Sequence, residues 1–281
     1  MKRRRRASVV ARRSLWWRAV VIGVCLAGGA LIVEGTFRRL RKSQLMQWGS
    51  RDARMWYPLL RSAQPDLRDS AVIGLAILDP DSERTIRGIA VMLADPDEQV
   101  RETAIRLLVS AAHQHDSSHY RVVRAIRTLH ASPSSFARAA SVQILGTLGE
   151  RARNEFPQLV KAASDSAALV RQAAAAAIGR HVLVTSAAAD YGARRATAQS
   201  LLVRATHDRS PDVRHVAIEA LFNLMPSDPN VLIDVLRASE HDDMPAVREL
   251  ARSLLTALDA DRSAPDPEQR DTPPRHSGHP R

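Results

Sequence analysis

One stretch of the sequence groups side chains that could bind a metal ion. His113, His115, Asp116 and His119 place three imidazoles and a carboxylate within seven residues. A zinc site needs three or four such ligands converging at about 2 Å, with further hydrogen bonds that orient them. Serine and glutamine surround these residues, a composition typical of a solvated loop. We therefore interpret the stretch as a loop and predict no metal ligand and no cofactor.

Two pairs of aspartates are candidates for acid–base chemistry. Asp79 and Asp81 flank one proline, and Asp95 and Asp97 flank another. Proline disfavours the helical conformation at the residue before it, and Asp-Pro-Asp is typical of a turn. We interpret both pairs as turns that separate helices.

A stripe of three arginines could bind an acidic partner. The three residues recur at every third position of one predicted helix: Arg121, Arg124 and Arg127. We interpret the stripe as a solvated helix face, with an acidic partner as the alternative. The sequence also lacks an H-E-x-x-H motif, a G-x-S-x-G motif and a glycine-rich phosphate loop. We therefore predict no catalytic residue and a protein that is not an enzyme.

The elements that position these side chains follow from a sequence phrase that recurs six times. Each copy starts with an apolar residue, which is usually followed directly by Arg. A small residue lies four positions after the first residue, and a second apolar residue lies eight positions after it. The copies begin at Leu67, Val100, Phe136, Val170, Val213 and Val247. Their starts are 33, 36, 34, 43 and 34 residues apart, a period that indicates stacked supersecondary units. The longest interval contains an insertion near 181–192, which we interpret as a tolerated bulge or a contact site.

Each copy follows another helical pattern, so the repeated unit is a pair of helices. Ile86, Ile89 and Leu93 share one helix face before a turn, and Val100 and Ala104 share a face after it. The chain is 45% hydrophobic but only 4% aromatic. This composition suits a stack of small helices that pack through Leu, Val, Ile and Ala.

Residues 45–258 resemble short, regular HEAT repeats. Four copies carry an Asp six positions before the Arg, with Val directly before that Arg. The first copy has Ser62 where the Asp belongs, and the third has Ala131 and Ala137 in place of Asp and Arg. The resemblance implies an all-α fold: a right-handed, armadillo-like α-solenoid of about six stacked helix pairs.

The four Asp-x5-Arg motifs have a structural interpretation. The Asp carboxylate can accept backbone N–H groups at the next helix start, and the Arg can reach a neighbouring unit with several donors. We expect a ladder of contacts along the stack, with a row of arginines for an acidic ligand as the alternative. The ladder residues are Asp95, Arg101, Asp165, Arg171, Asp208, Arg214, Asp242 and Arg248.

The resemblance also implies a function, because such stacks use their surfaces to bind partners. The second helix of each pair usually lines the concave side of a HEAT-like stack. Polar residues there are the predicted contacts for a protein or peptide: Glu102, Arg106, Gln172, His215, Glu219 and Arg252. We predict a scaffold for protein–protein interaction. The alternatives are a binder of nucleic acid or another anionic ligand, and a HEAT-like chromophore-attachment or lyase-type factor.

The location of the charge argues against nucleic acid. The whole chain has a formal net charge of +11. Residues 1–42 hold 12 Lys and Arg side chains and one acidic side chain, which accounts for the entire excess. Residues 43–281 are therefore neutral, with no excess charge to release counterions from a phosphate backbone.

The N-terminal segment has the pattern of a transmembrane helix. Residues 19–33 carry no charge, and tandem Trp and a Phe extend the span to 16–37. Twenty-two helical residues cross a hydrocarbon core of about 30 Å. We expect a single-pass anchor with a basic cytoplasmic segment at 1–15 and the repeats on the outer side, an orientation taken from the Lys/Arg bias.

Two alternatives to this anchor remain open. The segment could be a cleaved signal peptide, within which Arg12 and Arg13 loosely resemble a twin-arginine signal, or a lipoprotein signal with Cys25 as the lipidated residue. At the other end, residues 259–281 are rich in proline and charge, which predicts a disordered tail.

Overall fold

The computed structural model describes residues 52–114, 116–185, 189–226 and 228–262. The chain divides into two compact units, Met1–Met55 and Trp56–Arg281. In the first unit the described residues form one short 3-10 helix, η1 (Ala53–Met55). The second unit contains the repeats, and its described residues form helices and turns without a strand.

Eleven α-helices are found in the described residues. They are α2 (Pro65–Leu78), α3 (Glu83–Val91), α4 (Glu98–Gln114), α5 (Asp116–Arg127), α6 (Ser135–Leu148), α7 (Phe156–Ala162), α8 (Ala168–Val184), α9 (Tyr191–Ala205), α10 (Pro211–Leu224), α11 (Pro229–Ser239) and α12 (Pro245–Arg262). Four 3-10 helices join them: η2 (Tyr57–Arg61), η3 (Met92–Ala94), η4 (Thr128–Ala131) and η5 (Gly149–Glu155).

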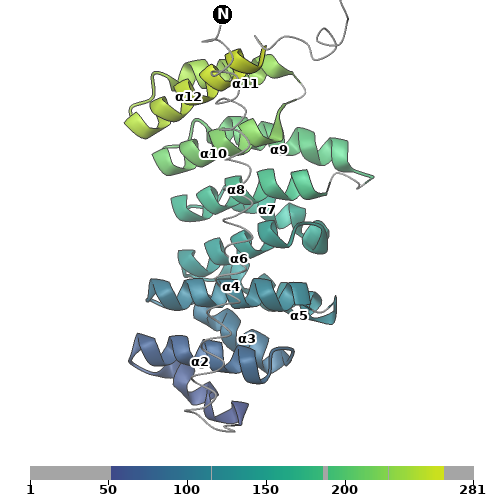
Figure 1. Ribbon diagram of the computed structural model, residues 1–281, viewed down its shortest axis with the longest axis vertical. Coiled ribbons are helices and arrows are strands. Elements are labelled where there is room, and N and C mark those ends of the chain that lie inside the picture. Colours follow the sequence, from purple (N-terminus) through teal and green to yellow (C-terminus); the bar gives the residue numbers. More distant parts are fainter. Residues whose placement is uncertain (1–51, 115, 186–188, 227, 263–281) are drawn as a thin grey trace, which may run out of the picture. The chain divides into compact units, whose positions relative to one another are not determined.

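The helices of the second unit form six pairs that stack in sequence order. The even-numbered helices from α2 to α12 follow one another along one side of the stack, and the odd-numbered ones lie beside them (Figure 1). We call the even-numbered set the second helices; η2 takes the place of a first helix in repeat 1. The expected all-helical solenoid is confirmed. Helix α12 runs to Arg262, so residues 259–262 are helical rather than part of the predicted tail.

The recurring phrase marks the residues that join the repeats into one core. Its small and apolar positions in the second helices are fully buried, as in Ala104 with Leu108 and Ala217 with Leu221. Burying each such Leu contributes about 1.5–3 kcal/mol relative to exposure. The phrase recurs because every repeat must cover the same face of the next.

Two glycines allow neighbouring second helices to approach closely. A Cβ atom on Gly146 of α6 would lie 2.6 Å from the Cβ of Ala177 in α8. A Cβ atom on Gly179 of α8 would lie 3.0 Å from the Cβ of Ala220 in α10. The helices at the centre of the stack are therefore in contact through their backbones.

The localisation predicted from the sequence is corrected by the structure. Among the residues that the structure describes, no helix is long and apolar enough to cross a membrane. The longest, α12, has 18 residues and alternates apolar with charged side chains. Single-pass membrane localisation is therefore not supported. The predicted segments 1–15 and 16–37 lie outside the described residues.

Candidate functional site

Arginines of the second helices contact aspartates of the following repeat. Arg171 donates through Nε and Nη2 to the two carboxylate oxygens of Asp208, at 2.7 and 2.8 Å. Its Nη1 donates to the carbonyls of Asp165 and Ser166 in its own turn, at 2.9 and 3.0 Å. Asp208 Oδ1 also accepts the backbone N–H of Ser210 at 2.8 Å. One guanidinium thus joins the turns of two successive repeats.

The same bidentate contact occurs at four interfaces between repeats. The pairs are Arg68–Asp95, Arg138–Asp165, Arg171–Asp208 and Arg214–Asp242. The aspartate side chains are at most 17% exposed, so water screens these pairs less than it screens surface ion pairs. We call this set of contacts the arginine ladder.

The ladder lowers the pKa of each of its aspartates. Hydrogen bonds from Arg214 lower the pKa of Asp242 to about 2. The Arg171 and Arg138 guanidiniums likewise lower the pKa values of Asp208 and Asp165. Burial acts to raise the pKa of Asp95, but Arg68 and backbone donors outweigh it, and the pKa falls.

Among the described residues, two of the four expected ladder arginines, Arg101 and Arg248, bind no aspartate of a following repeat. Arg101 places its guanidinium 4.1 Å from the centre of the Phe136 ring. Arg248 lies in the last described repeat and donates Nη1 to the carbonyls of Asp242 and Asp243 at 2.6 and 3.0 Å. Both arginines bind their own turns, so the motif spacing identified the turn contact and not the partner.

The third repeat contains a ladder arginine that the sequence phrase missed. The phrase begins at Phe136 and therefore places Ala137 in the Arg position, but Arg138 donates to Asp165 and to the carbonyl of Ser132. Ser132 rather than Ala131 occupies the Asp position, where its hydroxyl accepts the N–H of Ser134 at 3.2 Å. An alignment on Asp-or-Ser-x5-Arg, instead of on the apolar residue, finds this register.

The arginine stripe of α5 is largely exposed, as expected of a solvated face, with the Arg124 and Arg127 side chains 74% and 60% exposed, and it also contacts neighbouring repeats. Arg121 donates to the carbonyl of Asp81 at 2.7 Å, and Arg124 lies 3.7 Å from the carboxylate of Glu83. Arg127 pairs with Glu155 of the following repeat. These arginines brace the first-helix side of the stack.

The described residues of the histidine stretch lie in helices rather than in a loop. His113 lies at the end of α4, with Nδ1 2.8 Å from the carbonyl oxygen of Val109. His119 lies in α5, and its ring is tilted by 38° against that of Tyr120, with centroids 3.7 Å apart. His115 lies outside the described residues, and within them no three acidic, His or Cys side chains are grouped as a metal site would require.

Five of the six predicted contact residues lie on second helices near the middle of the stack. Glu102 and Arg106 are exposed one turn apart on α4, and His215 and Glu219 are one turn apart on α10. Gln172 lies half-buried on α8, between them in the stack. We call these five residues the second-helix row.

The sixth predicted contact, Arg252, lies elsewhere. It lines a cavity of about 510 Å³ between α11 and α12, and its Nε is 3.9 Å from Glu240. In earlier repeats the matching position holds a buried apolar residue, such as Val142 in α6 or Ile218 in α10. Arg252 therefore stands where a following repeat would pack, so it does not extend the second-helix row.

The insertion near 181–192 begins as an extension of α8. His181 and Val182 are fully buried in its last turns, and Val184 packs against Gly149. The His181 ring stacks on Phe156 with centroids 5.7 Å apart. Burial, together with the nearby Arg194 charge, lowers the pKa of His181. Residues 186–188 lie outside the described residues.

The sequence matches a protein-family model of HEAT repeats over residues 86–179. No curated protein matches the chain. Residues 86–179 thus carry the HEAT repeats that the Asp-x5-Arg motifs predicted.

Several solved structures share the fold. Kap95p in its complex with RanGDP is 13% identical; the match covers 80% of this chain and 33% of that one, with a TM-score of 0.63. The CpcE–CpcF complex of phycocyanin lyase from Nostoc sp. PCC7120 is 21% identical over 62% of this chain and 99% of that one, with a TM-score of 0.53. The Escherichia coli protein YibA is 18% identical over 82% of this chain and 76% of that one, with a TM-score of 0.53. The described residues of the second unit are a helical solenoid containing HEAT repeats.

Proposed function

We propose that this protein is a non-catalytic scaffold that binds a protein or peptide across its second-helix row. The observation that carries the proposal is a contrast between two sets of polar side chains. The ladder arginines and the α5 stripe are engaged with neighbouring repeats. Within the described residues, none of the five side chains of the second-helix row has an ion pair or a hydrogen bond to another repeat. A helix face whose polar side chains make no contact between repeats is available to a partner.

The charges of this row favour a protein over an anionic ligand. Glu102 and Glu219 are acidic, Arg106 is basic, and Gln172 and His215 are neutral donors or acceptors. A nucleic-acid surface needs basic side chains in excess to neutralise phosphates. A mixed row matches a protein partner, whose own surface carries charges of both signs.

The similar structures are consistent with this proposal at the level of fold. Kap95p is seen with a protein partner, RanGDP. The CpcE–CpcF complex belongs to a lyase, but an identity of 21% carries over no catalytic residue. No feature of the described residues favours a lyase role over a binding role.

The arginine ladder has a supporting role in this function. Four bidentate contacts fix the spacing of successive turns, and a surface built from several repeats keeps its shape only if that spacing is fixed. We propose that the eight Asp and Arg residues predicted as a ladder, with Arg68 and Arg138, brace the stack and do not contact the partner.

Site-specific photo-crosslinking tests the proposal. A photoreactive phenylalanine analogue is placed at Gln172 or Glu219 in the full chain, and at the exposed Lys161 on α7 as the matched control. We expect the same crosslinked protein from both row positions and not from Lys161. Charge reversal at a third residue of the second-helix row, Glu102→Arg, should reduce that crosslink several-fold. Equal crosslinking from Lys161, or none from the row, would contradict the proposal.

A further inference from the structure

The last repeat exposes a face that every earlier repeat buries. In all five earlier second helices, a fully buried aliphatic residue fills the position seven after the arginine that caps the turn: Leu75, Leu108, Leu145, Ile178 and Leu221. The matching residue of α12 is Leu255, which is only half-buried. Leu258, three residues later, is also half-buried, whereas its counterparts Leu148 and Leu224 are buried. The end of the stack is thus open where another repeat would pack.

Arg248 leaves the ladder unfinished at this end. Its Nη1 caps the carbonyls of its own turn, as Nη1 does in Arg171 and Arg214. In those two arginines, Nε and Nη2 bind an aspartate of the next repeat. Within the described residues, Arg248 has no such carboxylate. The geometry of its turn therefore presents two donors for one carboxylate at a fixed place.

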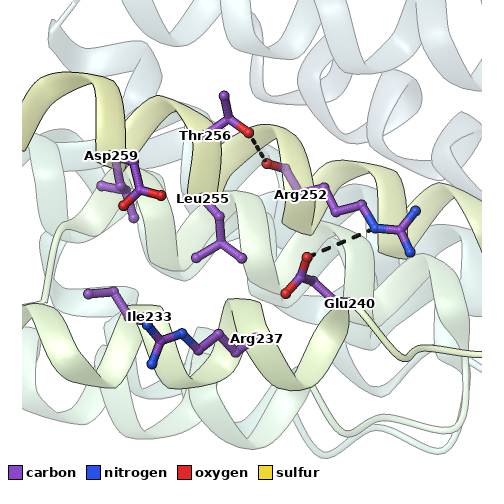
Figure 2. Close-up of a pocket in the computed structure, with 8 residues that line it drawn as sticks. Ile233, Arg237, Glu240, Arg252, Leu255, Thr256 and Asp259 are labelled. Atoms are coloured by element: carbon purple, nitrogen blue, oxygen red, sulfur yellow. Dashed lines mark hydrogen bonds and ion pairs between the residues drawn. The ribbon is translucent and has the colours of Figure 1, made fainter. Parts of the chain in front are cut away.

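The cavity between α11 and α12, lined by Arg252 one turn after Arg248, lies further along the same helix. Figure 2 shows Leu255 on α12 and Ile233 and Arg237 on α11 pointing into the space between the two helices. Arg252 lies one turn after Arg248 and reaches toward Glu240. The site therefore offers arginines at one end and apolar side chains at the other, spread over about three turns of one helix.

We propose that the chain's own segment 263–271 occupies this end of the stack and that Asp271 completes the ladder at Arg248. This segment has three acidic residues and one basic residue, together with two prolines. Running back along α12, it brings its prolines to the leucines first, then Glu268 to Arg252, and then Asp271 to Arg248. The carboxylates of the segment come in the same order as the arginines of the helix.

The lengths exclude Asp266 and allow Asp271 to reach Arg248. From Arg262 back to Arg248 is 14 helical residues, or about 21 Å. The nine residues from Arg262 to Asp271 can span about 30 Å when extended, whereas the four residues to Asp266 span about 14 Å at most. Asp271 reaches Arg248 with length to spare, and Asp266 does not.

A second copy of the chain would not complete the ladder in the same way. Head-to-tail stacking would bring repeat 1 of one copy against repeat 6 of another. Repeat 1 has Ser62 at the aspartate position, where its hydroxyl accepts the N–H of Gln64 at 3.2 Å. Since Ser62 offers no carboxylate to Arg248, the segment of the same chain is the better-matched occupant. This inference is independent of the proposed partner surface.

Limited proteolysis of the full chain tests this docking. The rate of tryptic cleavage after Arg270 is measured for the chain and, as a reference, for a free peptide of residues 263–281. We expect cleavage in the chain to be slower than in the peptide by at least about fivefold, because docking keeps the bond from the protease. Arg248→Gln and Asp271→Asn should each remove most of this protection, every variant being normalised to a peptide of its own sequence.

Two control variants separate docking from general loosening. Arg101→Gln also removes a guanidinium that caps its own turn, but it lies far from the C-terminal segment in the sequence. Asp266→Asn removes a charge that cannot reach Arg248. Neither should change the protection. If circular dichroism shows that Arg248→Gln disturbs the fold, the proposal is judged from Asp271→Asn alone, because Asp271 lies outside the repeats.

Three results would overturn the proposal. The first is equal cleavage of chain and peptide after Arg270. The second is an effect of Arg101→Gln or Asp266→Asn as large as that of Asp271→Asn. The third is protection that rises with protein concentration, which would assign the docked segment to another copy.

Discussion

The contact between Arg214 and Asp242 predicts a measurable coupling energy between repeats 5 and 6. Arg214 donates Nε and Nη2 to the carboxylate of Asp242 at 2.7 and 2.6 Å. Both side chains are about one-tenth exposed. A pKa that falls from 3.8 to about 2 for Asp242 corresponds to about 2.4 kcal/mol of preference for the ionised carboxylate in the folded chain. Since Asp242 also accepts the N–H of Met244, we expect about 1–2 kcal/mol of this to be coupling to Arg214.

A double-mutant cycle measures this coupling. Arg214→Gln, Asp242→Asn and the double variant are compared with the original chain by urea unfolding, followed by circular dichroism at pH 7 and at pH 3. The folded pKa of Asp242 is lowered, so its stabilisation is fully present above the unfolded value near 4. It is lost as the pH falls through about 2. We therefore expect the coupling at pH 3 to be about half of its value at pH 7.

The interrupted interface between repeats 2 and 3 supplies the control for this cycle. Arg101 and Ser132 occupy the matching positions there, and Arg101 lies over Phe136 instead of binding a carboxylate. The cycle of Arg101→Gln and Ser132→Ala should therefore give a coupling near zero at both pH values. The reasoning is refuted by a coupling below about 0.3 kcal/mol for Arg214 and Asp242 at pH 7, or by a coupling that is the same at pH 3.

Three further predictions follow from close contacts, burial and the gap in the ladder. Gly146→Ala should destabilise the chain by about 1–3 kcal/mol through overpacking against α8. Gly192→Ala, where nothing lies within 4 Å, should stabilise it by about 0.5–1 kcal/mol, and urea midpoints for the two variants check the sign. Burial lowers the pKa of His181, so its contribution to stability should be lost as the pH falls below about 6.5; His181→Leu should flatten this part of the stability–pH curve. Ser132→Asp should give Arg101 its missing carboxylate and raise stability by about 0.5–1 kcal/mol at pH 7, and a gain that persists at pH 2 would contradict this reasoning.

The ladder illustrates why the motif spacing predicted some contacts and not others. The sequence places an Asp six residues before an Arg, and both side chains meet the same turn because the Asp lies in that turn and the Arg lies near the start of the helix that follows it. The bond from Arg171 to Asp208 joins residues that are 37 positions apart. Its formation depends on how one repeat lies over the next, which the spacing within a repeat does not contain.

The polar residues outside the ladder depended even more on the tertiary structure. The α5 stripe has the period of a solvated face, but neighbouring repeats bring Asp81, Glu83 and Glu155 to it. Arg252 is on the same helix as Arg248. It is four positions after that arginine, whereas Glu219 of the second-helix row is five positions after Arg214, so Arg252 faces the open end of the stack and not the row. In both cases the sequence pattern predicted the helix correctly, but it did not predict which residues of neighbouring helices lie beside these arginines.

The sequence by itself determined that this protein is a stack of helix pairs, because each repeat must present the same small and apolar positions to the next. It also determined the turns, where Asp or Ser and the following Arg are local in the chain. The tertiary structure alone decided which arginine meets which carboxylate, which polar residues stay available, and where the stack is left open. These depend on distances between residues of different repeats, and such distances are set by helix packing rather than by local sequence.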